Sequence, residues 1–483
     1  MLRIPILFTP LPMPHLNLYS NLHSTFHSKL LPGHRPRVLA RALFCLGLVL
    51  PMGLLLNGFG KSKPDVMQEM RLPESIGLTV LQNTPWTTLA GDSDPKAEAI
   101  VQEYLSLLKS QGLNPAEQGI WFQSGPSLLT ENQGKTPLSA ASLTKITTTL
   151  AALETWGPQH QFETTIAATG PIQNGVLQGD LVVQGSGDPM FVWEEAIALG
   201  NQLNALGIQQ VAGDLVISGP FIMNFEVNPA KAGPLLYQAL NTKTWSGEIA
   251  EQYGKMKPKP PQKPTIAING KVRLGEIGNA QPLIKHQSLP VLHLVKRLNV
   301  YSNNVMSETL SQLLGGAEVT RQKAAAAAGL SPEEILIVNG SGLGTENRIA
   351  PHATMTMFTA IARYAERNGF TIADLFPISG TDVGTLIDRN IPKNAVVKTG
   401  SLNEVSALSG VMPTRDRGLV WFSIINRGTN IEGLRQQQDV LLNRLQAHRG
   451  SPKGRSASIT PTPAVNTPNS LLGAPERNIR VTP

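Results

Sequence analysis

Cysteine is nearly absent from this chain, which carries only Cys45. A disulfide within the chain is therefore impossible, and the cysteine count neither supports nor excludes an oxidising compartment. The nine histidines form no HExxH motif and no paired Cys/His spacing, so a structural or catalytic zinc site is not expected.

Acidic residues are absent from positions 1–64, which carry seven lysines and arginines. Residues 449–483 add a net charge of +4, so residues 65–448 hold −4 of the chain's total of +7. The body of the protein is thus mildly acidic, whereas a nucleic-acid-binding protein would carry a basic face there. Nucleic acid is not an expected partner.

An apolar segment at 42–60 is bounded by basic residues on both sides. Those residues are Arg35, Arg37, Arg41, Lys61 and Lys63. Basic residues before an apolar run keep that end in the cytoplasm and direct the chain beyond the run to be exported. The run has about the length of a signal peptide and is slightly short for a membrane span. We predict an exported protein, in the periplasm or on the outer face of the cytoplasmic membrane, whose leader (1–64) is a cleaved signal or an uncleaved anchor.

The remaining chain divides into three kinds of segment. A length of 483 residues with 41% hydrophobic and 16% charged residues predicts two or three globular units. One unit should begin and end with a helix, at Asp94–Gln111 and about Ile431–Ala447, with three strands near its C-terminal end. Residues 171–285 are rich in Gly and short β-type runs, which predicts an inserted β-rich region. Residues 449–483 are predicted to be a disordered tail.

The first motif with catalytic potential is Ser142-Leu143-Thr144-Lys145. The run behind it has a helical pattern, so Ser142 should lie near a helix N-terminus with Lys145 on the same face. A lysine there could accept the serine proton if burial lowers its pKa. An S-x-x-K motif alone is weak evidence, because about one is expected by chance in a chain of this size.

Two more motifs occur further along the chain. Ser302-Asn303-Asn304 comes after an apolar segment, and it offers a hydroxyl for proton transfer and an amide to hold a peptide backbone. Lys398-Thr399-Gly400-Ser401 ends a predicted strand. It offers a cation and hydroxyls for a substrate carboxylate, and Gly400 permits close approach of the backbone to a ligand. In this order, the three motifs match the serine acyl-transfer pattern of penicillin-binding proteins and class A β-lactamases.

At these residues the sequence resembles the low-molecular-mass class C penicillin-binding proteins, the D-Ala-D-Ala carboxypeptidase/endopeptidase (S13) family. Lys145 and Ser302 are separated by far more residues than in a β-lactamase, and that family carries a large insertion there, which 171–285 fits. The likeness covers about 85–448. Further similar segments are Leu138–Ile166, Gly179–Pro189, Asn339–Leu343 with Asn347-Arg348, and Gly380–Leu386 with Arg389. This chain departs from the family pattern at Asn339 and Asn303, where Asp is usual, and at Gly344-Thr345, where Ser-Arg is usual.

The resemblance implies an α+β fold with a transpeptidase-like core, 85–170 and 286–448, in which helices flank a five-stranded antiparallel sheet. It implies that Ser142 is the nucleophile, Lys145 its base, and Ser302 a proton shuttle assisted by Lys398. Further implied roles are backbone binding by Asn304, carboxylate binding by Thr399 and Ser401, close approach at Gly400, and an oxyanion hole from the N–H groups of Ser142 and Ser401. The implied partners are peptidoglycan peptides and, as covalent inhibitors, β-lactams. No metal or organic cofactor is implied.

Two other functions compete with this interpretation. A β-lactamase-like hydrolase of class A would need a Glu for deacylation, and no E-x-x-L-N occurs between the second and third motifs. A catalytically silent envelope protein that only binds peptidoglycan would not require intact Ser142, Lys145, Ser302 and Lys398. The sequence therefore favours a serine D-Ala-D-Ala carboxypeptidase, with endopeptidase action left open.

Overall fold

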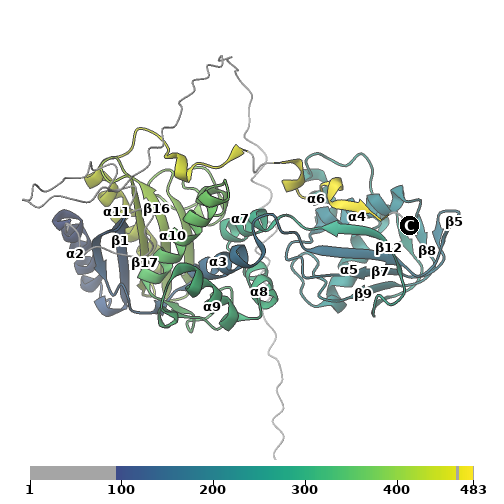
Figure 1. Ribbon diagram of the computed structural model, residues 1–483, viewed down its shortest axis with the longest axis horizontal. Helices are drawn as coiled ribbons and strands as arrows, with labels where there is room; N and C mark the ends of the chain where they lie inside the picture. Colours follow the sequence, from purple (N-terminus) through teal and green to yellow (C-terminus); the bar gives the residue numbers. More distant parts are fainter. Residues whose placement is uncertain (1–93, 464–466, 482–483) are drawn as a thin grey trace, which may run out of the picture. The chain divides into compact units, whose positions relative to one another are not determined.

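A computed structural model describes residues 94–463 and 467–481 of the chain. The predicted leader lies outside them. The main body is built on a five-stranded antiparallel sheet of order β15-β16-β17-β1-β2 (Figure 1). Its strands are β1 Gln118–Ser124, β2 Ser127–Asn132, β15 Val396–Leu402, β16 Val405–Pro413 and β17 Leu419–Arg427. The five-stranded antiparallel core predicted from the sequence is confirmed.

Both faces of this sheet are covered, and alternate residues serve two separate cores. Val396 belongs to the core formed with helices α3 (Thr144–Trp156) and α10 (Pro351–Arg367), whereas Val397 belongs to the core formed with α2 and α11. Strand β16, which lies between β15 and β17, is buried at every position. A strand buried on both sides is rich in apolar residues, and for this reason β15, β16 and β17 could be located from the sequence, whereas the complete five-stranded sheet was implied by the family resemblance.

The helices that open and close the main body end close to their predicted limits. α2 spans Pro95–Ser110, with the Asp94 side chain accepting a hydrogen bond from the Ala97 N–H, and α11 spans Ile431–Arg449. Asp94 also contacts Arg449, so the start of one helix is fixed to the end of the other. The remaining helices of the main body are α7 Val291–Tyr301, α8 Asn304–Leu313 and α9 Ala317–Ala328. A small sheet of order β13-β14-β3 joins Ile335–Leu336, Arg348–Ile349 and Leu138–Ser139.

The inserted region differs from the prediction in its limits and in its secondary structure, because it contains helices as well as strands. Its six-stranded sheet, β11-β9-β7-β4-β12-β18, starts before residue 171 and ends after residue 285. The strands are β4 Glu163–Ala168, β7 Leu181–Gln184, β9 Leu215–Ser218, β11 Val272–Leu274, β12 Gln281–Gln287 and β18 Asn478–Arg480. Three helices accompany it: α4 Trp193–Ala205, α5 Pro229–Ala239 and α6 Gly247–Lys255. A second sheet, β10-β8-β6-β5, contains Ala267–Ile268, Gln210–Val211, Val176–Leu177 and Ile172–Gln173.

A short sequence repeat explains the parallel part of this sheet. Gly-Asp-Leu-Val occurs at the start of both β7 and β9, which pair in parallel with Leu181 opposite Leu215. The Asp180 side chain accepts a hydrogen bond from the Asp214 N–H, and the Asp214 side chain accepts one from the Lys271 N–H, each at 2.8 Å. Each aspartate therefore holds the start of the neighbouring parallel strand, Asp180 that of β9 and Asp214 that of β11, so the repeat sets the register of the parallel strands.

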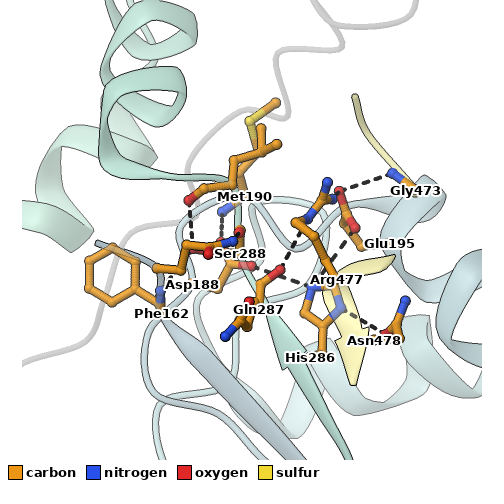
Figure 2. A network of polar contacts seen from close by, with 12 residues as sticks. Phe162, Asp188, Met190, Glu195, His286, Gln287, Ser288, Gly473, Arg477 and Asn478 are labelled. Carbon is orange, nitrogen blue, oxygen red and sulfur yellow. Dashed lines mark hydrogen bonds and ion pairs between the residues drawn. The ribbon is translucent and has the colours of Figure 1, made fainter. Parts of the chain in front are cut away.

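The prediction of a disordered tail is wrong for the C-terminal residues that the structure describes. β18 pairs antiparallel with β12, and Arg477 is almost fully buried (1% exposed). Figure 2 shows Arg477 against Glu195, beside the buried His286 of β12. The Asn478 side chain contacts His286 Nδ1 at 2.9 Å. Composition gave the wrong prediction because the Pro- and Ser-rich segment has no apolar stripe of its own. The segment is instead ordered by its buried ion pair with Glu195 and by pairing with strand β12.

Candidate active site

Ser142 lies in a tight turn between strand β3 and helix α3. Ala141–Leu143 forms a 3₁₀ turn ahead of α3, and Ala141 adopts a left-handed φ of 47°. A left-handed backbone at a non-glycine residue is uncommon and needs support from its surroundings. Gly342 supplies that support, because any Cβ at its position would overlap the Ala141 carbonyl oxygen. The turn aims the serine hydroxyl at the residue three positions later.

Lys145 is fully buried (0% exposed) and its ammonium nitrogen is surrounded by oxygen atoms. Lys145 Nζ lies 2.8 Å from Ser142 Oγ, 2.8 Å from Asn304 Oδ1 and 2.6 Å from the Ser341 carbonyl oxygen. Burial lowers its pKa from 10.5 to about 7, against a smaller opposing effect of the Glu308 carboxylate. The proton transfer expected from the sequence requires a lysine with a lowered pKa beside the serine, and Lys145 has both the position and the burial for this.

Ser302 and Asn304 lie at the corner between two helices. α7 ends at Tyr301, Ser302 takes a left-handed φ of 52°, and α8 begins at Asn304. The Asn303 side chain caps α8 by accepting a hydrogen bond from the Met306 N–H at 3.0 Å. Asn is as good an N-cap as Asp, so the departure from the family pattern at this position is conservative. The corner between the two helices places Ser302 Oγ against Lys398 Nζ and Asn304 Oδ1 against Lys145 Nζ.

Lys398 and Gly400 lie on the face of β15 that meets Ser142. Lys398 is fully buried (0% exposed), and its Nζ lies 2.8 Å from Ser302 Oγ and 2.7 Å from the Thr399 carbonyl oxygen. Burial lowers its pKa well below the usual value, and the nearby Lys145 charge lowers it further. A Cβ on Gly400 would stand 3.1 Å from the Ser142 nitrogen, so a glycine is required for this close approach.

Thr399 and Ser401 point away from Gly400, as strand alternation predicts. Thr399 Oγ1 donates to Thr385 Oγ1 at 2.8 Å, and Thr385 belongs to a 3₁₀ turn at Gly384–Leu386. Ser401 is exposed and accepts a hydrogen bond from Arg435 Nη2 at 2.9 Å. Strand β15 therefore presents two hydroxyl groups, those of Thr399 and Ser401, in the residues that follow the buried Lys398.

The structure thus brings residues of all three motifs together through two sets of contacts, which the second motif joins because it contributes a residue to each. Ser142 contacts Lys145, Lys145 contacts Asn304, and Ser302 contacts Lys398. Their separations along the sequence are 3, 159 and 96 residues. Thr399, Gly400 and Ser401 complete the set from the same strand as Lys398.

Sequence reasoning missed three participants. The first is the Ser341 carbonyl, which lies in the segment where the family usually has Asp at position 339. The Asn339 side chain accepts a hydrogen bond from the Gly342 N–H at 2.8 Å, so the asparagine stabilises this turn. Glu308 accepts from the backbone N–H groups of Gly340 and Ser341, at 3.1 and 3.0 Å, and so positions the carbonyl that contacts Lys145. Arg435, the third, occurs in no motif. A backbone carbonyl has no sequence signature, and nothing in the spacing singled out the two charged residues.

Comparisons with known proteins identify the family of the chain. The model of the D-Ala-D-Ala carboxypeptidase 3 (S13) family matches residues 107–221 and 248–447. D-alanyl-D-alanine carboxypeptidase DacB of Haemophilus influenzae is 25% identical over 388 residues, which cover 60% of this chain and 80% of that protein. A D-alanyl-D-alanine carboxypeptidase of Actinomadura is 23% identical over 494 residues, covering 78% of this chain and 90% of that protein.

A similar fold is found among solved structures. The penicillin G-acylated Bd3459 predatory endopeptidase of Bdellovibrio bacteriovorus, in complex with an immunity protein, superposes with a TM-score of 0.65 at 18% identity. The match covers 75% of this chain and 99% of that one. Since the family model spans more than half of the sequence, including all three motifs, the chain belongs to the D-Ala-D-Ala carboxypeptidase 3 (S13) family and is a serine-type carboxypeptidase.

Proposed function

We propose that the chain hydrolyses the terminal D-Ala-D-Ala bond of peptidoglycan stem peptides through an acyl-enzyme on Ser142. The arrangement around Lys145 Nζ carries this proposal. A neutral amine has two N–H donors and one lone pair, and Asn304 Oδ1 and the Ser341 carbonyl can only accept. They take both donors, so the lone pair is directed at Ser142 Oγ and can remove its proton.

The remaining residues divide the other steps among them. Ser142 Oγ attacks the carbonyl carbon, its proton passes to Lys145, and the developing oxyanion lies at the N–H groups of Ser142 and Ser401. Ser302, held by Lys398, delivers its proton to the leaving D-Ala nitrogen as the peptide bond breaks, and the proton that Lys145 took from Ser142 replaces it, so that Lys145 is neutral again and Ser302 regains its hydroxyl. Asn304 holds the substrate backbone, and Thr399 and Ser401 bind the substrate carboxylate with Gly400 allowing close approach. Water then attacks the ester carbonyl and gives a proton to Lys145; the bond to Ser142 Oγ breaks, and Lys145 returns that proton to the Ser142 oxygen while the shortened peptide leaves as its carboxylic acid.

The same site supports two related reactions. A β-lactam carries a strained amide beside a carboxylate, so it would acylate Ser142 as the peptide does, and one similar structure is a penicillin G-acylated enzyme. That structure and others with the same fold are named as endopeptidases, which supports cleavage of cross-links as a second activity. An endopeptidase reaction needs the same nucleophile and base and only a longer leaving group.

Product analysis across pH tests the reaction and its base together. Because the pKa of Lys145 is lowered to about 7, the neutral amine needed for attack is lost as the pH falls below that value. D-Ala release from purified pentapeptide muropeptides should therefore fall about tenfold per pH unit below pH ~7 and level off above it. Mass spectrometry distinguishes loss of one D-Ala from cleavage of cross-links. Tetrapeptide muropeptides without the terminal D-Ala are the control; a pH-independent rate through this range would contradict Lys145 as the base.

We further propose that the folded part acts outside the cytoplasmic membrane. Within residues 94–463 and 467–481, no helix is long and apolar enough to span a bilayer. The basic and apolar leader carries this proposal, together with a relative named as a D-alanyl-D-alanine carboxypeptidase and a similar structure named as a peptidoglycan endopeptidase. A reporter that is active only after export should give signal when fused after Ala90. A reporter active only in the cytoplasm should be silent at the same position, and the reverse pattern would reject export.

A further inference from the structure

We propose that Arg435 of helix α11 binds the substrate's carboxylate beside the scissile bond, and so selects substrates with a free acid there. The inference rests on the proposed acyl transfer at Ser142 and adds a charged residue to its substrate-binding strand. Arg435 lies outside the three motifs, and its guanidinium meets the last residue of the third one, at Ser401 Oγ.

The lysine of the third motif is poorly placed to serve as this cation. Lys398 has no exposed surface, and its Nζ is already engaged by Ser302 Oγ and the Thr399 carbonyl. Its pKa is lowered well below normal, by burial and by the Lys145 charge, so the charged form is disfavoured. A substrate carboxylate that meets Thr399 and Ser401 therefore needs its positive charge from another residue.

Arg435 has both the exposure and the donors for this task. Its side chain is 36% exposed, and Arg keeps its charge at all relevant pH values. Nη2 donates to Ser401 Oγ at 2.9 Å, and Nη1 lies 3.5 Å from the exposed Glu432 carboxylate. A guanidinium has five N–H donors in a planar fork, so these two contacts leave donors for an incoming carboxylate.

The helix that carries Arg435 is fixed in register against the sheet. Gln438, one turn further along α11, is fully buried and donates to the Ser406 carbonyl at 3.0 Å and to Asn426 Oδ1 at 2.8 Å. Ser406 is the direct strand partner of Ser401. The guanidinium is thus held over the end of β15 by a buried anchor, which distinguishes it from a solvated surface charge.

A pair of penicillins that differ only in the carboxylate tests the proposal. We expect Arg435→Gln to lower the second-order rate of acylation by benzylpenicillin about 10- to 100-fold, the usual effect of losing one charged hydrogen bond. For benzylpenicillin methyl ester, whose carboxylate is masked, the rates of variant and unaltered protein should be equal. Mass spectrometry of the intact protein follows the adduct, and the melting temperature checks the fold.

Arg444→Gln is the matched control, because Arg444 lies on the same helix but pairs with Glu103 away from β15. It should leave both rates unchanged. An equal fall with acid and ester, or no fall with the acid, would overturn the role of Arg435. If the unaltered protein forms no adduct on Ser142 with either compound, the proposed function itself fails, and that result is distinct from either outcome for Arg435.

Discussion

Replacing Ser142 with alanine should abolish covalent labelling by penicillin and reduce D-Ala release by about 10⁶-fold, the scale seen when a serine nucleophile is removed. The hydroxyl oxygen is the atom that forms the ester, and among the described residues Ser142 is the only side chain in hydrogen-bond contact with Lys145 Nζ that can be acylated. Labelling with a fluorescent penicillin and chromatographic assay of D-Ala measure the two effects. The fold should be retained, because only one partly buried oxygen is lost.

Ser139→Ala provides the control for this experiment. Ser139 lies three residues before Ser142, at the end of β3, and its buried hydroxyl has no hydrogen-bond partner within the described residues. Its removal should leave labelling and D-Ala release unchanged. A Ser142→Ala protein that still forms a covalent penicillin adduct would remove the basis for assigning the nucleophile.

The parts of the fold that sequence could predict are those with a strong local signal. Helix α2 has a capping Asp94, a following proline and an apolar stripe, and these signals locate it to within a residue at each end. Strand β17 contains a nearly continuous apolar run, and strand β16 is also rich in apolar residues, because both faces of the sheet are buried. The motif residues could be found because their chemistry restricts residue type, and the structure brings them together from distant parts of the chain.

The parts that sequence could not predict depend on long-range contacts. β18 forms only because β12 offers a free edge and Glu195 a buried partner for Arg477, and neither is visible near the C-terminus. The inserted region contains three helices, α4, α5 and α6, between its Gly-rich turns, and those turns dominated the sequence pattern. Within the site, Ser341 contributes a backbone carbonyl and Glu308 holds it in place, a relation set by the tertiary fold alone.

Lys398 provides the second large effect that we expect, and Lys398→Met tests it. Lys398 is fully buried, so it is not a solvated charge at the end of a strand. Methionine has a similar length and no donor, so it limits the cavity that alanine would leave. The lost hydrogen bonds to Ser302 and Thr399 are offset in part by the removed cost of burying an amine, so the melting temperature should change by only a few degrees.

The acylation chemistry, in contrast, should change strongly in Lys398→Met. Ser302 would lose the partner that orients its hydroxyl and lowers the cost of moving its proton, and loss of a positioned acid–base partner slows a reaction about 10²–10⁴-fold. The concentration dependence of penicillin acylation separates binding from chemistry, and the fall should be in the limiting rate. Lys393→Met removes an exposed lysine shortly before the same strand and should leave that rate unchanged. A near-normal limiting rate in Lys398→Met would mean that Ser302 works without Lys398, and the role of Lys398 in the proton relay would have to be withdrawn.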